Sequence, residues 1–238
     1  MLEIKHLTKK YGNLVAVGDL SLTIEDGDIF GFIGLNGAGK TTTIKAVTGI
    51  HQFDSGDILV DGVSIKTDPI ACKQQMAYIP DNPDIYEFMT GIKYLNFVAD
   101  MFGVSQADRK ARIEQFTNSL ELADDLASPI SSYSHGMKQK LAVIGGLIHE
   151  PKLMVLDEPF VGLDPKATFT LKEHFRAMTA AGDCIFFSTH GLEVAQNLCN
   201  KIAIIDKGVL LEAGPIDEIV GKKSLEDVFL ALTADEAA

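Results

Sequence analysis

The sequence predicts an α/β fold built on a mainly parallel β-sheet, with a helical subdomain inserted into it. Short apolar runs typical of strands alternate with segments of helical periodicity over residues 153–206, as expected for strands joined by crossover helices and covered on both faces. A glycine-rich segment at 34–39 separates an apolar run at 29–33 from a helical segment at 41–48. From 91 to 128, apolar residues recur every three or four positions without a strand-like run, which predicts helices.

The N-terminal part is predicted to consist of strands separated by turns. Apolar runs predict strands at 2–7, 20–24, 29–33, 57–60 and 76–79. Asp61 and Gly62 supply a tight turn after the fourth run, and Pro80 ends the fifth. Gly49 ends the helix at 41–48. These breaks fix the order of the elements before the helical stretch.

The C-terminal part returns to strands and helices in alternation. Strands are predicted at 153–156, 184–188, 202–206 and 209–212, and helices at 166–180, at 192–199 and near the C-terminus. Lys207 and Gly208 turn the chain between the last two strands. Residues 234–238 are expected to fray.

Composition and charge exclude several classes of partner. The 238 residues include 21 Lys and Arg against 33 Asp and Glu, a formal net charge of −12. Nucleic-acid footprints and charge-driven binding to anionic lipid need clustered basic residues, so neither is expected. The longest apolar run, 141–148, is far shorter than the ~18–20 residues that span a bilayer, and no secretory signal is expected. Cys72, Cys184 and Cys199 lack metal or redox spacing, which predicts buried thiols in a soluble intracellular protein.

The glycine-rich segment fits the phosphate-loop pattern G-x-x-x-x-G-K-[ST]. The residues of this phosphate loop are Gly34, Leu35, Asn36, Gly37, Ala38, Gly39, Lys40, Thr41 and Thr42. Its glycines let N–H groups turn toward a phosphate at the positive N-terminus of the following helix. Lys40 is expected to reach the β- and γ-phosphates, Thr41 to bind Mg²⁺ and Thr42 to reach the α-phosphate. The alternative is a flexible glycine-rich loop between a strand and a helix, which would not account for the complete motif.

Two acids, Asp157 and Glu158, follow the buried strand at 153–156. Ligands of open α/β sheets bind at the carboxyl ends of strands, so both side chains are expected to face the phosphate loop. Asp157 is the candidate Mg²⁺ ligand, and Glu158 is the candidate residue that polarises the attacking water. A strand that simply ends in solvated acids is the alternative.

Residues 133–137, Tyr-Ser-His-Gly-Met, precede a predicted helix, where Ser134 would by itself serve as an ordinary N-cap. Taken with the two motifs above, the chain resembles the nucleotide-binding subunits of ATP-binding cassette (ABC) transporters over essentially its whole length. The family's signature, usually Leu-Ser-Gly-Gly-Gln, aligns with Tyr133, Ser134, His135, Gly136 and Met137. Met137 replaces the glutamine, which removes a side-chain hydrogen-bonding group.

The resemblance implies a P-loop NTPase fold of the ABC ATPase type and a single domain over 1–238. Residues 1–86 and 150–238 would form the catalytic core, with an N-terminal antiparallel β-subdomain. Residues 87–149 would form the inserted helical subdomain that carries the signature.

The resemblance also implies roles for individual residues. Two subunits pair head to tail, so the signature residues Ser134, His135, Gly136 and Met137 would serve the partner's ATP. Tyr11 would stack on adenine, a position that a core or surface tyrosine could also occupy. His190 would contact the γ-phosphate and join Lys40 and Glu158 as the catalytic residues; the alternative is a structural histidine. Asp164 would communicate across the dimer, and it also suits a helix N-cap before Pro165.

One position departs from the family pattern. The family commonly has glutamine in the loop that joins the core to the helical subdomain, where this chain has Asp81. An acid here resembles a branch of bacterial export-type systems and makes Asp81 a further candidate metal ligand. Asn82 is an alternative source of the amide, and Asp81 would also suit a turn cap. Tyr86 and Phe88 follow where the family docks its membrane subunit, although helical-subdomain core is the alternative for them.

The implied function is the ATP-binding and ATP-hydrolysing subunit of an ABC transporter, with ATP and Mg²⁺ as cofactors. Its partners would be an integral-membrane permease and a second copy or a homologous ATPase, at the cytoplasmic face of the membrane, with export as the direction. A regulatory ATP-dependent switch on a membrane complex is one alternative. A soluble cassette ATPase acting on ribosomes or DNA is another, which the net charge of −12 disfavours.

Overall fold

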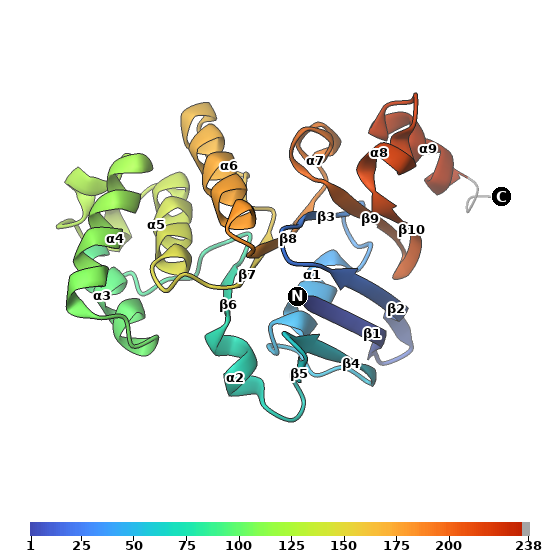
Figure 1. Cartoon of the computed structure of the whole chain (residues 1–238), viewed down its shortest axis with the longest axis horizontal. Coiled ribbons are helices and arrows are strands. Elements are labelled where there is room, and N and C mark those ends of the chain that lie inside the picture. Colours follow the sequence, from blue (N-terminus) through green and yellow to red (C-terminus); the bar gives the residue numbers. More distant parts are fainter. Residues whose placement is uncertain (235–238) are drawn as a thin grey trace.

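The computed structural model describes residues 1–234 and has the predicted α/β architecture (Figure 1). Its central sheet has six strands in the order β10-β9-β3-β8-β7-β6. All neighbouring pairs are parallel except β10, which runs antiparallel to β9. The strands are β3 (Ile29–Ile33), β6 (Met76–Ile79), β7 (Leu153–Asp157), β8 (Cys184–Thr189), β9 (Lys201–Asp206) and β10 (Val209–Pro215). The prediction of a mainly parallel sheet is confirmed.

A second, antiparallel sheet has the order β2-β1-β4-β5. Its strands are β1 (Leu2–Tyr11), β2 (Leu14–Ile24), β4 (Ser55–Val60) and β5 (Val63–Ser64). The first two strands are longer than the predicted 2–7 and 20–24 because their hairpin extends to a turn at Gly12, whose φ is +60°. The β1–β2 pairing contains register shifts that interrupt the alternation of apolar and polar residues, and this conceals the outer part of the hairpin in the sequence.

Helices cover the central sheet on both faces. They are α1 (Lys40–Val47), α2 (Pro69–Gln74), α6 (Pro165–Ala180), α7 (Leu192–Leu198), α8 (Ile216–Val220) and α9 (Leu225–Ala234). Helix α2 was not predicted from the sequence; it has six residues and is capped by the Asp68 side chain, which accepts the Ala71 N–H.

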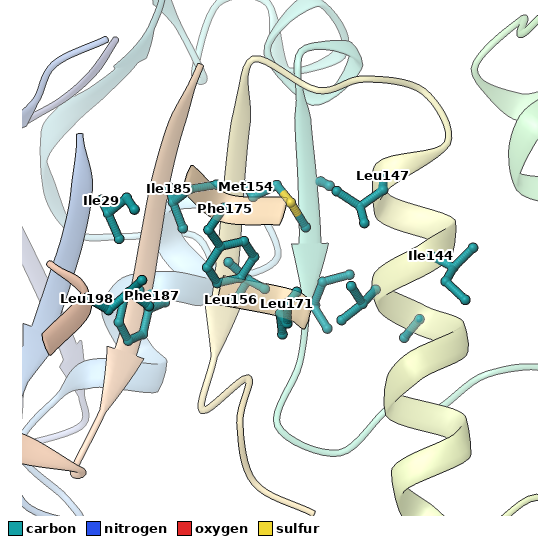
Figure 2. Packing of buried hydrophobic residues seen from close by; sticks show 14 of the residues in the cluster. Ile29, Ile144, Leu147, Met154, Leu156, Leu171, Phe175, Ile185, Phe187 and Leu198 are labelled. Atoms are coloured by element: carbon teal, nitrogen blue, oxygen red, sulfur yellow. The ribbon is translucent and has the colours of Figure 1, made fainter. Parts of the chain in front are cut away.

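Side chains along the central strands point alternately to the two faces of the sheet and pack into two separate hydrophobic cores. Phe30, Phe32 and Phe186 belong to the core shared with α1 and the antiparallel sheet. Phe187 belongs to the opposite core, together with Phe175 of α6 (Figure 2). The two cores hold the sheet rigidly between layers, so the loops at its carboxyl edge start from fixed points.

The helical stretch forms α3 (Gly91–Met101), α4 (Gln106–Ser119) and α5 (His135–Leu147), with two 3₁₀ turns at Ala123–Asp125 and Ile130–Ser132. These helices lie beside the β6 edge of the central sheet (Figure 1). The three cysteines are free and buried, as predicted. Within residues 1–234, no helix is both long and apolar enough to cross a membrane. Residues 235–238, part of the stretch expected to fray, lie outside the described residues.

Candidate active site

The phosphate loop connects the carboxyl end of β3 to α1, as predicted. A Cβ atom on Gly34 would lie 2.5 Å from the carbonyl oxygen of Ile205 and 2.9 Å from the Cβ of Ala38. Gly39 has a φ of +108° and immediately precedes Lys40, the first residue of α1. The loop therefore needs glycine at both positions, one for close approach to β9 and one for a left-handed turn into the helix.

Lys40 is buried, and its side chain folds back onto the phosphate loop. Its ammonium donates to the carbonyl oxygens of Gly34 at 2.6 Å and Leu35 at 3.2 Å, and lies 3.8 Å from Glu158 Oε1. Burial lowers the pKa of the Lys40 ammonium, and the charges of Glu158 and Asp157 partly offset this. Carbonyl oxygens are weaker partners for an ammonium than phosphate oxygens, so Lys40 can exchange them for a bound phosphate.

Asp157 ends β7 in full burial, at 1% exposure. Its Oδ1 accepts a hydrogen bond from the Ser188 hydroxyl, but its Oδ2 has no hydrogen-bond partner among the described residues. A buried carboxylate oxygen without a partner is costly unless a ligand satisfies it. Thr41 lines the same pocket as Asp157. One carboxylate and one hydroxyl fit Mg²⁺, which takes few protein ligands and keeps waters and phosphate oxygens.

Glu158 joins the other parts of the site. Its Oε1 lies 2.9 Å from His190 Nδ1, in addition to the contact with Lys40. Its φ is +48°, an uncommon conformation for a residue with a side chain. The backbone N–H of Glu158 is held by both the Ser188 carbonyl oxygen at 3.2 Å and the Ser188 hydroxyl at 3.1 Å. The strained backbone is thus fixed from β8, which places the carboxylate over the loop.

A pocket of about 450 Å³ brings most of the predicted residues together. It is lined by Tyr11, Leu14, Val15, Ala16, Leu35, Asn36, Gly37, Gly39, Lys40, Thr41, Thr42, Asp81, Asp157, Glu158 and Lys207. Gly34 and Ala38 are buried within the loop and do not line it. His190 reaches the pocket through Glu158.

Four lining residues, Leu14, Val15, Ala16 and Lys207, were not predicted. The first three lie on β2, and Lys207 lies in the turn between β9 and β10. This turn is bonded to the loop through the Gly208 N–H, which donates to the Ala38 carbonyl at 2.9 Å, and to β2 through the Gly18 N–H, which donates to the Gly208 carbonyl at 2.9 Å. The sequence predicted the turn at Lys207 and Gly208, but not its contacts with the phosphate loop and β2.

Asp81 lies at the pocket edge, where its Oδ1 accepts the N–H of Asn82 at 2.8 Å. Asp81 therefore caps this turn, which is one of the alternatives that its sequence position allowed. Asp81 also lines the pocket, as Asp157 and Glu158 do.

The signature segment lies outside the pocket. Ser134 caps α5 by accepting the N–H of Met137 at 3.2 Å, and none of residues 133–137 lines the pocket. The N-terminus of α5 instead packs on residues 161–164, because a Cβ on Gly136 would lie 2.6 Å from the Gly162 carbonyl oxygen. A Cβ on Gly162 would in turn lie 2.5 Å from the ring of His135.

Asp164 forms a second link between α5 and the loop after β7. Its carboxylate accepts the Ala167 N–H at 2.8 Å and pairs with Lys140 of α5 at 3.0 Å. The hydrogen bond from Ala167 and the one from Lys140 lower the pKa of the Asp164 carboxyl. Asp164 is therefore the N-cap of α6, as its sequence position allowed, and it also ties α5 to the loop that follows β7.

The family model for ABC transporters matches residues 17–161. The chain belongs to this family. The chain is 33% identical over 242 residues to the ABC-type transporter ATP-binding protein EcsA of Bacillus subtilis (strain 168), covering 100% of this chain and 98% of EcsA. It is 36% identical over 214 residues to the uncharacterized ABC transporter ATP-binding protein YhcH of the same organism, covering 89% of this chain and 69% of YhcH.

A solved structure described as the ATP binding subunit of an ABC transporter superposes with a TM-score of 0.94 at 34% identity, covering 98% of this chain and 99% of that one. The prediction of an ABC ATPase fold is confirmed. Membership of the family likewise confirms that the nucleotide is ATP and that the chain is an ATP-hydrolysing subunit of a transporter.

Proposed function

We propose that this ABC ATPase works as a head-to-tail pair, with a second copy or a homologous subunit, at the cytoplasmic face of the membrane. The observation that carries the proposal is the separation of the signature from the pocket: Ser134 and Gly136 lie outside it, at the exposed N-terminus of α5. The pocket has its own phosphate loop and acids but no signature. A second chain placed head to tail would supply one to each site.

Within each site, the residues have distinct proposed roles. Lys40 leaves its loop carbonyls to hold the β- and γ-phosphates, while Thr42 and the loop N–H groups hold the remaining phosphate oxygens. Glu158 orients the attacking water, and His190 contacts the γ-phosphate and restrains the Glu158 carboxylate. Mg²⁺, held by Thr41 and Asp157 with Asp81 as a further candidate, would neutralise charge that develops on the phosphates. Phosphoryl transfer needs mainly such positioning and charge stabilisation.

A separate membrane permease would dock beside the helical subdomain. Tyr86 is 50% exposed and Phe88 is 82% exposed, and their ring centroids lie 5.7 Å apart. Tyr86 also lines a groove of about 320 Å³ between the β6 edge and α3, together with Phe97 and Val98. Exposed aromatics beside an apolar groove are typical of a protein-binding surface. Residues 1–86 and 150–238 would then form the catalytic core, and residues 87–149 the docking and signature subdomain.

Export is the proposed direction, supported by the resemblance that Asp81 gives to an export-type branch. Hydrolysis in the paired sites would open the pair again, and the difference in ATP affinity between the open and closed pairs would drive the permease.

The head-to-tail arrangement is tested by mixing two inactive variants. Lys40→Ala removes the phosphate contact in its own site, and Ser134→Ala removes the signature contact in the partner's site. In a mixed pair, one site contains both defects and the other contains neither, so the mixture should recover ATPase activity that neither variant has alone. No recovery at any mixing ratio would reject a head-to-tail pair of two copies of this chain. Affinity purification from detergent extracts tests the permease, because a membrane protein should be recovered with the tagged chain.

A further inference from the structure

Tyr11, on the wall of the nucleotide pocket, is held from outside that pocket by His51. The Tyr11 hydroxyl and His51 Nδ1 form a hydrogen bond of 2.8 Å, and the two rings meet edge to face with centroids 6.2 Å apart. Tyr11 lines the pocket, whereas His51 does not. Tyr11 is 44% exposed at the tip of the β1–β2 hairpin, so few other contacts restrain its ring.

His51 is itself fixed to the C-terminal end of α1. Its backbone N–H donates to the Lys45 carbonyl at 3.0 Å, and the N–H of Ile50 donates to the same carbonyl at 2.9 Å. The helix that carries Lys40 at its first residue therefore carries the anchor of Tyr11 just beyond its last turn. Helix α1 therefore connects the phosphate end of the pocket to the residue that holds Tyr11.

A second clamp joins the same segment to β1. The Lys10 N–H donates to Asp54 Oδ2 at 2.6 Å, and the Asp54 N–H donates to the Thr8 carbonyl at 2.8 Å. The Lys9 ammonium lies over the Tyr11 ring, 4.9 Å from its centroid. Since this cation occupies one face of the ring, the angle at which the ring is held determines how its other face is presented to a base.

We propose that His51 is a positioning residue for the nucleotide base: it holds the Tyr11 ring in a fixed orientation, so that adenine stacks on a wall already set by α1. The inference rests on the stacking of adenine on Tyr11 that the family resemblance implies. His51 acts through Tyr11 rather than by touching the nucleotide. A side chain that is already fixed before the ligand binds loses less conformational entropy on binding.

The experiment measures binding of ADP and of inorganic pyrophosphate to the full chain by titration calorimetry and competition. His51→Ala should raise the Kd for ADP by roughly two- to tenfold, the range expected for one hydrogen bond or one ordered side chain. It should leave the Kd for pyrophosphate unchanged, because pyrophosphate has no base. His51→Asn, whose amide can replace Nδ1 as a hydrogen-bond partner, should restore much of the ADP affinity.

Tyr11→Phe, which removes only the hydroxyl, should match His51→Ala, and the double variant should be no weaker than either single variant. In ATP turnover, His51→Ala should raise KM and leave kcat unchanged. The matched control is His6→Ala, which removes an exposed imidazole that contacts Asp19 at 2.8 Å on the same β1–β2 hairpin. This control should bind ADP as the wild type does.

Three outcomes overturn the inference. In the first, His51→Ala leaves ADP affinity unchanged while Tyr11→Ala weakens it. In the second, His51→Ala weakens the binding of pyrophosphate as much as the binding of ADP, which would mean that the substitution acts on the phosphate loop. In the third, Tyr11→Ala leaves ADP affinity unchanged, and this result alone also removes the proposed adenine stacking.

Discussion

Ser188 holds both acidic residues of the active site, so its replacement by alanine tests how the site is built. The hydroxyl is fully buried, donates to Asp157 Oδ1 and accepts the Glu158 N–H. A hydrogen bond to a charged group contributes about 1.5–3 kcal/mol and a neutral one about 0.5–1.5 kcal/mol. Because Asp157 Oδ2 already lacks a partner, alanine would leave the whole buried carboxylate without a hydrogen bond among the described residues. We expect Ser188→Ala to lower the free energy of unfolding by about 2–4 kcal/mol.

For a chain of 238 residues, this loss corresponds to a fall in Tm of roughly 4–16 °C. Urea and thermal unfolding measure it, and kcat for ATP should fall by about tenfold or more because the Glu158 carboxylate is no longer fixed. Ser119→Ala is the matched control, since that hydroxyl bonds the Phe116 carbonyl and His174 but no carboxylate; it should cost about 1 kcal/mol and leave kcat unchanged. Wild-type Tm and wild-type kcat in Ser188→Ala would show that this hydroxyl does not hold the two acids.

Three further predictions concern pH, the loop and the docking surface. Burial lowers the pKa of His149 to about 4, so as pH falls from 6.5 to 4 the unfolded chain takes up a proton at His149 before the folded protein does. Over this range, urea unfolding should show that the free energy of unfolding falls by about 1–3 kcal/mol more in the wild type than in His149→Gln. The same pH dependence in both proteins would contradict this. Gly34→Ala would place its Cβ against the Ile205 carbonyl and should weaken ATP binding by roughly tenfold or more in calorimetry, so an unchanged Kd would be the contrary result. Phe88→Ser should leave Tm unchanged, since this ring is 82% exposed, but should reduce co-purification of a membrane protein; undiminished recovery would remove Phe88 from the docking surface.

The parts of the fold that sequence reasoning predicted are those determined by short stretches of chain. The strand β6 was predicted at 76–79 and observed at Met76–Ile79, because an apolar run stopped by Pro80 leaves little freedom. The phosphate loop and the pair Asp157 and Glu158 follow buried strands, and parallel strands bring their carboxyl ends to one edge. Local pattern and topology together therefore predicted the centre of the site.

The parts that were missed depend on pairing between distant segments. Leu14 and Val15 reach the pocket because β1 and β2 continue beyond their regular apolar alternation, through register shifts. Lys207 reaches it because the β9–β10 turn is bonded to Ala38 and to β2. His51 approaches Tyr11 from a segment 40 residues away, and no spacing pattern in the sequence marks that contact.

The central claim is that Glu158 orients the water that attacks ATP in sites shared between two chains. Glu158→Gln keeps the size of the side chain and removes its charge, beside Lys40 at 3.8 Å and His190 at 2.9 Å. The measurement combines ATP turnover with the molar mass of the variant by light scattering in ATP and in ADP. We expect Glu158→Gln to bind ATP about as tightly as the wild type, to turn it over about 10²–10³-fold more slowly, and to be a dimer in ATP but not in ADP. Turnover at the wild-type rate, or a monomer with ATP bound, would contradict the central claim.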